Sequence, residues 1–98
     1  MKHYIILATD DILSTGFILT LNDIFGTANM YLSPSVRPEN LEHYIWKGIG
    51  SHSKKIIVTK AELDELKVNG NSFFLTIVSQ NGGDYLLRGN IVEIDQIQ

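Results

Sequence analysis

Apolar residues are concentrated most clearly in the C-terminal third of the chain. An apolar run, Phe73 to Ser79, is followed by Gln80-Asn81-Gly82-Gly83 and by the mixed segment 84–88. β-branched and aromatic residues favour extended backbone, and Asn-Gly supplies the positive φ angles that a tight reversal needs. The pattern predicts an antiparallel hairpin of residues 73–79 and 84–88. The apolar phase changes afterwards, and Gly89-Asn90 predicts a bulge that absorbs the change before a last strand.

The N-terminal third begins with a short apolar run, residues 3–9, which ends at Asp10-Asp11. Such a run is typical of a central strand that is buried on both faces. Apolar residues then recur at spacings of one, three and four through residue 32, which predicts a helix capped by Asp10 or Asp11. Two glycines and several threonines in this segment disfavour a helix. They leave open a hairpin in which residues 17–21 turn at Asn22-Asp23 and return through Ile24-Phe25.

The middle of the chain predicts shorter elements. The prolines in segment 33–38 predict a loop, after which Pro38 can open a short helix, although the segment 44–46 equally suits a strand. Residues 54–58 predict another strand. Thr59 and Glu62 then match a capping box, in which each side chain satisfies a free amide at a helix start, and we expect a short helix through Leu66.

The order of these elements predicts a single α+β domain over residues 1–98. A sheet with two or three helices would result, and the succession resembles a ferredoxin-like βαββαβ plan with an added C-terminal hairpin strand. A length of 98 residues with 44% hydrophobic content supports one core but not two.

Composition narrows the function classes. The chain has no cysteine and a formal net charge of −3, with 8 basic and 11 acidic residues. Thiolate chemistry and disulfides are therefore excluded, and nucleic acid is an unfavoured partner because no segment is strongly basic. No signal peptide or apolar stretch long enough to cross a bilayer is apparent, so we expect no membrane association and a cytoplasmic location.

Candidate chemistry is sparse. The three histidines, His3, His43 and His52, do not have the spacing of metal ligands on one helix, and no cofactor motif is present. Asp10-Asp11 follows the first strand, where acidic Mg²⁺ ligands often lie in α/β proteins, but helix capping explains the pair better. We assign no catalytic residue, no metal and no cofactor, and the sequence favours a non-enzymatic role over an enzymatic one without deciding between them.

The remaining feature of the sequence is a set of residues typical of protein–protein interfaces. Aromatic residues and arginines are frequent in interfaces, and Tyr31, Arg37, Tyr44 and Trp46 cluster around the proline loop, although core packing of Trp46 is the stronger interpretation of that ring. Arg88 completes the candidate protein-binding residues. The edge of the strand after Asp84 offers a second docking surface, to another protein or to a second copy of the chain.

These observations predict a small acidic interaction module that binds and blocks another, more basic protein, as inhibitors, immunity proteins and phage accessory factors do. The alternative is a dimeric small-ligand-binding or enzymatic domain with a cleft near Asp10, Asp11 and His52. Nucleic-acid binding is a third hypothesis, and it requires that Lys54, Lys55, Lys60 and Arg88 converge on one face.

Overall fold

The computed structural model describes residues 1–34, 37–68 and 70–97, apart from the side chain of Asn81. Six strands, two short α-helices and one 3₁₀ turn are present in these residues. They follow the chain as β1 (Lys2–Leu7), α1 (Asp10–Leu13), β2 (Phe17–Pro34), η1 (Leu41–His43), β3 (Trp46–Gly48), β4 (Ser53–Val58), α2 (Lys60–Glu65), β5 (Ser72–Gly89) and β6 (Glu93–Ile97).

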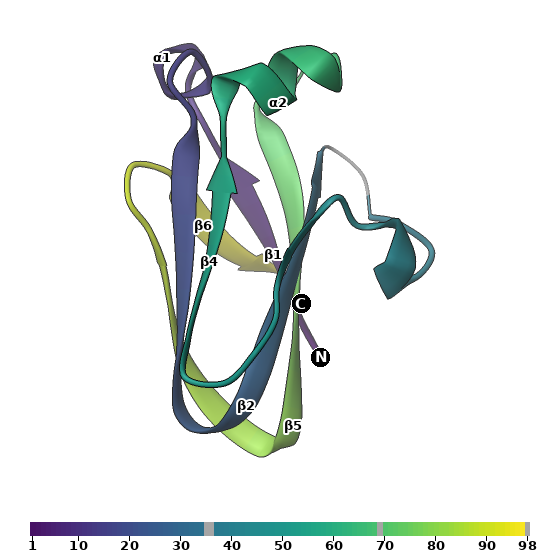
Figure 1. Ribbon diagram of the computed structural model, residues 1–98, viewed down its shortest axis with the longest axis vertical. Helices are drawn as coiled ribbons and strands as arrows, with labels where there is room; N and C mark the ends of the chain where they lie inside the picture. Colours follow the sequence, from purple (N-terminus) through teal and green to yellow (C-terminus); the bar gives the residue numbers. More distant parts are fainter. Residues whose placement is uncertain (35–36, 69, 98) are drawn as a thin grey trace.

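Two long strands, β2 and β5, organise the fold. They pair antiparallel along nearly their whole length, from Leu19 opposite Gly89 to Pro34 opposite Phe73. Both strands turn back on themselves at the same end of the molecule (Figure 1), so each has two arms. The register shifts at this bend, on either side of Phe25. Bulges increase the local bend and twist of a strand, which accounts for the turn without a break in the pairing.

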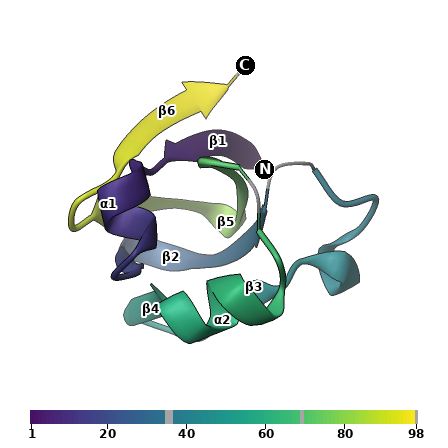
Figure 2. The same ribbon diagram turned by 90° about the horizontal axis from the view of Figure 1, so that it is seen from above.

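The shorter strands extend the two arms. β4 pairs with the first arm of β2, and β3 pairs with the second arm. β1 pairs with the first arm of β5 and with β6 on its other edge. The smaller half-sheet is therefore β4–β2–β5, built on the first arm of β2 and the second arm of β5. The larger half-sheet is β3–β2–β5–β1–β6, built on the second arm of β2 and the first arm of β5. Figure 2 shows these strands arranged around a common centre, and in Figure 1 both helices lie at the end opposite the bend.

The core fills the space between the half-sheets. Every second residue of the arms points inward. In both arms of β2 and the first arm of β5 these side chains include six that are at most 1% exposed, Leu19 and Leu21, Met30 and Leu32, Leu75 and Ile77, whereas Tyr85 and Leu87 in the second arm of β5 are partly buried. Phe17 and Phe73 meet edge to face at 5.0 Å below the helices. Burying such side chains supplies the main driving force for folding, about 1.5–3 kcal/mol for each one.

The ferredoxin-like α+β prediction is wrong. The fold is a mostly antiparallel, strongly bent sheet, and its two α-helices have only four and six residues. The helix predicted to follow Asp10-Asp11 ends at Leu13, and its N-cap is Thr9, whose hydroxyl accepts from the amide of Ile12. From Phe17 onward the chain is extended, so the hairpin alternative was closer, although the reversal lies a few residues later than expected.

The predicted C-terminal hairpin is also incorrect in its pairing. Residues 73–79 and 84–88 are both extended, but each pairs with an arm of β2. Gly89 ends β5, so Gly89-Asn90 separates two strands and forms no bulge within one. The first strand, predicted as buried on both faces, is paired on both edges but has mixed exposure along its length.

Several local predictions are confirmed. Residues 54–58 form most of β4, and the expected short helix is α2, with Leu66 as its C-cap. Both hydrogen bonds of the Thr59–Glu62 capping box are present. The segment from Pro38 to residue 46, for which a short helix and a strand were both open, contains the turn η1 and then the start of the short strand β3. None of the helices in the described residues has the length and apolar content that crossing a membrane requires.

Candidate binding surfaces

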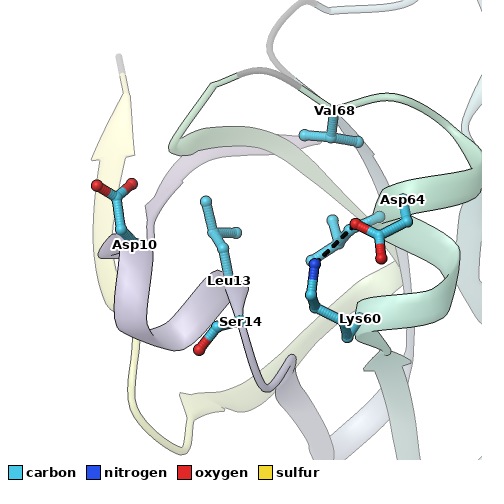
Figure 3. Close-up of a pocket in the computed structure, with 7 residues that line it drawn as sticks. Asp10, Leu13, Ser14, Lys60, Asp64 and Val68 are labelled. Atoms are coloured by element: carbon cyan, nitrogen blue, oxygen red, sulfur yellow. Dashed lines mark hydrogen bonds and ion pairs between the residues drawn. The ribbon is translucent and has the colours of Figure 1, made fainter.

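A cleft of about 200 Å³ lies between α1 and α2. Its walls carry Asp10 and Ser14 from α1 and its C-cap, and Lys60 and Asp64 from α2. In Figure 3 the Asp10 carboxylate lies on the opposite side of the cleft from the Lys60–Asp64 ion pair, which joins Nζ to Oδ1 at 2.8 Å. Asp10 Oδ1 instead accepts a hydrogen bond from the side-chain Nδ2 of Asn71, at 3.3 Å. The hydroxyl of Ser14 donates to the backbone carbonyl of Asp11, so among the described residues that line this cleft it is not bonded to a side-chain base.

The residues of the alternative enzymatic site do not come together. Asp10 and Asp11 lie in α1, at the helix end of the molecule, whereas His52 precedes β4 at the bend. The six residues of β4 separate the two places, a distance of roughly 20 Å at 3.3 Å per residue. All three side chains are exposed to solvent. Among the described residues, no group of three His, Asp or Glu side chains could hold a metal ion.

Two of the predicted contact residues are in the interior. Trp46 is 7% exposed and Tyr44 is 5% exposed, so neither ring offers contact area to a partner. The indole Nε1–H of Trp46 donates to Glu62 Oε2 at 3.0 Å and joins β3 to α2. This hydrogen bond holds the pKa of Glu62 below its usual value, together with the bonds from Thr59. Trp46 is therefore a core residue with a polar anchor.

Tyr44 belongs to a hydrogen-bonded chain over the outer face of the larger half-sheet. Its hydroxyl lies 2.6 Å from Thr76 Oγ1, which is 3.0 Å from His3 Nδ1. The ring of Tyr31 packs edge to face against Tyr44, and Arg37 lies over the ring of Phe74. Burial, followed by the charge of Arg37, lowers the pKa of His3. The segment that carries Arg37 and Tyr44 thus covers this face around Phe74 and Thr76.

The outer face of the smaller half-sheet is different, because the outward side chains of β4 and of the second arm of β5 are exposed, while those of the central strand β2 are partly buried. The register of β4, β2 and β5 places Lys55, Thr20 and Arg88 in one row across the three strands. In the next row toward the helices, Ile57 lies opposite Ile18. We call this surface the open face and define it by six residues: Ile18, Thr20, Lys55, Ile57, Arg88 and Ile91.

The end of the open face nearest the helices is apolar and contains a recess. Ile57 and Ile91 are 54% and 50% exposed, and with Ile18 they line a recess of about 280 Å³. Asn90 fixes the border of this recess through two hydrogen bonds to Ile18. Its side-chain Oδ1 accepts from the backbone N–H of Ile18 at 3.0 Å, and its backbone N–H donates to the carbonyl of Ile18.

The bend carries a second group of exposed apolar side chains, Ile24, Phe25 and Ile49, which are 59–63% exposed. It is held from inside by Asp23, which accepts from the ammonium of Lys54 and from the amides of His52 and Ala28. The backbone of His52 also bonds to Asp23 in the reverse direction, from Asp23 N–H to the His52 carbonyl.

The candidate residues are thus dispersed. Arg88 lies on the open face, Tyr31 and Arg37 belong to the covered face, and Tyr44 and Trp46 are buried. Sequence reasoning missed Ile18, Ile57 and Ile91, although an apolar residue at an outward position of the alternating strand 54–58 was a readable signal for Ile57. Lys54, Lys55, Lys60 and Arg88 do not converge, because Lys54 is buried and Lys60 lies on α2. Comparison of the chain with models of protein families, with curated proteins and with solved structures finds no match.

Proposed function

We propose that this chain is a binding module that recognises another protein through its open face and blocks the surface to which it binds. The observation that supports this proposal is the contrast between the two half-sheets. The segment that carries Arg37 and Tyr44 covers the outer face of the larger half-sheet around Phe74 and Thr76, whereas the outer face of the smaller one exposes Ile57 and Ile91. Exposed apolar side chains that gather at a recess are typical of interaction sites.

The rigidity of the scaffold further supports contact recognition. Five of the six open-face residues lie on paired strands, and Ile91 lies in the short connection between β5 and β6. The backbone of these strands is already ordered, so it loses little conformational freedom when a partner binds. Binding as an inhibitor, immunity protein or accessory factor needs such a surface and no catalytic group. We keep the cytoplasm as the expected compartment on the sequence argument alone.

Affinity capture from the native host tests the proposal. The bait is the wild-type chain, compared with the double variant Ile57→Gln/Ile91→Gln, which removes the apolar contacts and keeps the fold. Ile45→Gln is the matched control, because Ile45 is 46% exposed but lies outside the open face. We expect a protein that wild type and control retain and the double variant loses. Equal retention by all three baits would contradict the proposal, provided that their thermal unfolding curves agree.

A further inference from the structure

The charges of the open face point to the chemistry of its partner. Lys55 and Arg88 flank Thr20 in one row, and neither cation takes part in an ion pair with another described residue. Their strands lie on either side of β2, so their backbones are about 10 Å apart, at two strand spacings. Both side chains are exposed and long enough to reach a group placed over Thr20. Two unpaired cations therefore face one position.

The positive charge of Lys55 and Arg88 contrasts with the net negative charge of the chain. The net charge is −3, so the surface outside this row is more acidic than the chain as a whole. The acidic residue nearest along the same arm of β5 is Asp84, four residues from Arg88 and roughly 13 Å away along the strand. Toward the bend, the row beside Lys55 is Ser53–Asn22–Leu86, and His52 lies beyond it. In the part of the chain that the structure describes, no carboxylate lies beside Lys55 or Arg88 in their own row or in the next row toward the bend.

We infer that the open face binds a protein surface on which an Asp or Glu carboxylate lies next to an apolar side chain. The carboxylate would sit over Thr20 between Lys55 and Arg88, and the apolar side chain would enter the recess of Ile18, Ile57 and Ile91. A guanidinium can hold a carboxylate through two parallel N–H···O bonds, which fixes its position as well as its charge. This inference rests on the proposed function, since it names what that binding surface recognises.

Local and net charge lead to different expectations for the partner. The net charge of −3 favours approach to a more basic protein, because steering acts over a Debye length, about 8 Å or more at physiological salt. The contact itself is decided by groups that lie opposite each other, and there the open face is cationic. The two expectations are compatible for a basic partner that presents a carboxylate at the contact.

Carbodiimide crosslinking of the captured complex is the direct test, because this reagent joins an amine to a carboxylate only when the two are in contact. We expect mass spectrometry to find Lys55 joined to an Asp or Glu of the partner. We further expect Arg88→Glu to weaken binding by about tenfold or more, and Arg88→Lys to weaken it less. Lys47→Glu, which reverses an exposed charge on β3, is the matched control and should bind as the wild type does.

The outcomes separate this inference from the proposed function. If Ile57→Gln/Ile91→Gln abolishes capture while Arg88→Glu and Lys55→Glu bind normally, the carboxylate contact is refuted and the binding function stands. If none of these variants changes capture, both are refuted. A crosslink from Lys55 to a second copy of this chain, or capture that nuclease treatment abolishes, overturns the inference of a heterologous protein partner.

Discussion

The ammonium of Lys54 and the carboxylate of Asp23 form a buried ion pair, with Nζ 2.5 Å from Oδ1 and side-chain exposures of 2% and 6%. The pair joins β4 to the first arm of β2 just before the bend. Because Asp23 also accepts from the amides of Ala28 and His52, one carboxylate connects both arms of β2 and the loop before β4. The shape of the bend, and hence the placement of the open face, depends on this residue.

Replacement of Asp23 should be strongly destabilising. Asp23→Ala leaves a buried ammonium and two amides without their acceptor, and loss of one partner from a buried ion pair typically costs about 3–5 kcal/mol. The control is Asp64→Ala, which breaks the exposed Lys60–Asp64 pair on α2 and should cost less than about 1 kcal/mol. Urea unfolding measures both free energies. Similar values for the two variants would show that the buried pair does not hold the bend.

Stability should fall in acid because of the same carboxylate. The hydrogen bond from Lys54 comes first among the interactions that lower the pKa of Asp23, and the amides of Ala28 and His52 add to it against the opposing effect of burial. A carboxyl group with a lowered pKa in the folded state contributes stability above its unfolded pKa, about 3.9, and loses it as the pH falls through the folded value. The free energy of unfolding should therefore decrease below about pH 4.

Comparison with Asp23→Asn isolates this contribution. The variant cannot titrate at residue 23, so its free energy of unfolding should be lower at neutral pH and should depend less steeply on pH in the acid range. Glu62, whose pKa is lowered chiefly by the hydrogen bond from Trp46, contributes a slope of the same sign in both proteins. Parallel curves for wild type and Asp23→Asn from pH 7 to pH 2 would contradict the assignment.

Glu62 should contribute more to the stability of the fold than its position on a short helix indicates. Glu62→Ala removes half of the capping box of α2 and leaves the indole N–H of Trp46 without its acceptor. We expect a loss of about 1–3 kcal/mol, from the missing cap and the unpaired donor. Trp46 is the single tryptophan, so its fluorescence reports the change directly. Glu65→Ala, at an exposed position on the same helix, should change neither stability nor the emission maximum appreciably.

The bend should not tolerate a side chain at Gly26. Its φ of +71° lies in the left-handed region, and a Cβ there would be 2.8 Å from the Cα of Gly83. Gly82 has a similar φ of +64°, but a Cβ there would have no other atom within 4 Å. Gly82→Ala should therefore cost only the conformational term, about 1–2 kcal/mol, and Gly26→Ala should cost clearly more. Equal losses in thermal unfolding would show that the close approach of the two strands does not constrain the bend.

The positions of the apolar residues in β2 explain why the sequence of this strand predicted a helix. Buried residues occupy odd positions in the first arm, Phe17, Leu19 and Leu21, and even positions in the second arm, Ala28, Met30 and Leu32. The bulges at the bend shift the phase, so that Leu21 and Ala28, the buried residues on either side of the bend, are seven residues apart. Exposed Ile24 and Phe25 add further apolar positions, and the combined pattern matches a helix.

Interactions close in sequence were predictable, whereas distant pairings were not. The Thr59–Glu62 capping box and the alternation of β4 need only neighbouring residues, and both are present. The register of Thr20 opposite both Lys55 and Arg88 depends on how β2 and β5 bend together, which no local pattern indicates. The open face is assembled from three distant segments, and for that reason it could not be found from spacing.

The central claim is that binding occurs at the open face, and amide chemical shifts of the isotope-labelled chain in complex with its captured partner test it most directly. We predict the largest changes at Ile18, Lys55, Ile57 and Arg88, with little change at Tyr31 and Lys47 on the larger half-sheet. The opposite distribution, with changes confined to Tyr31, Lys47 and their neighbours, would contradict the account.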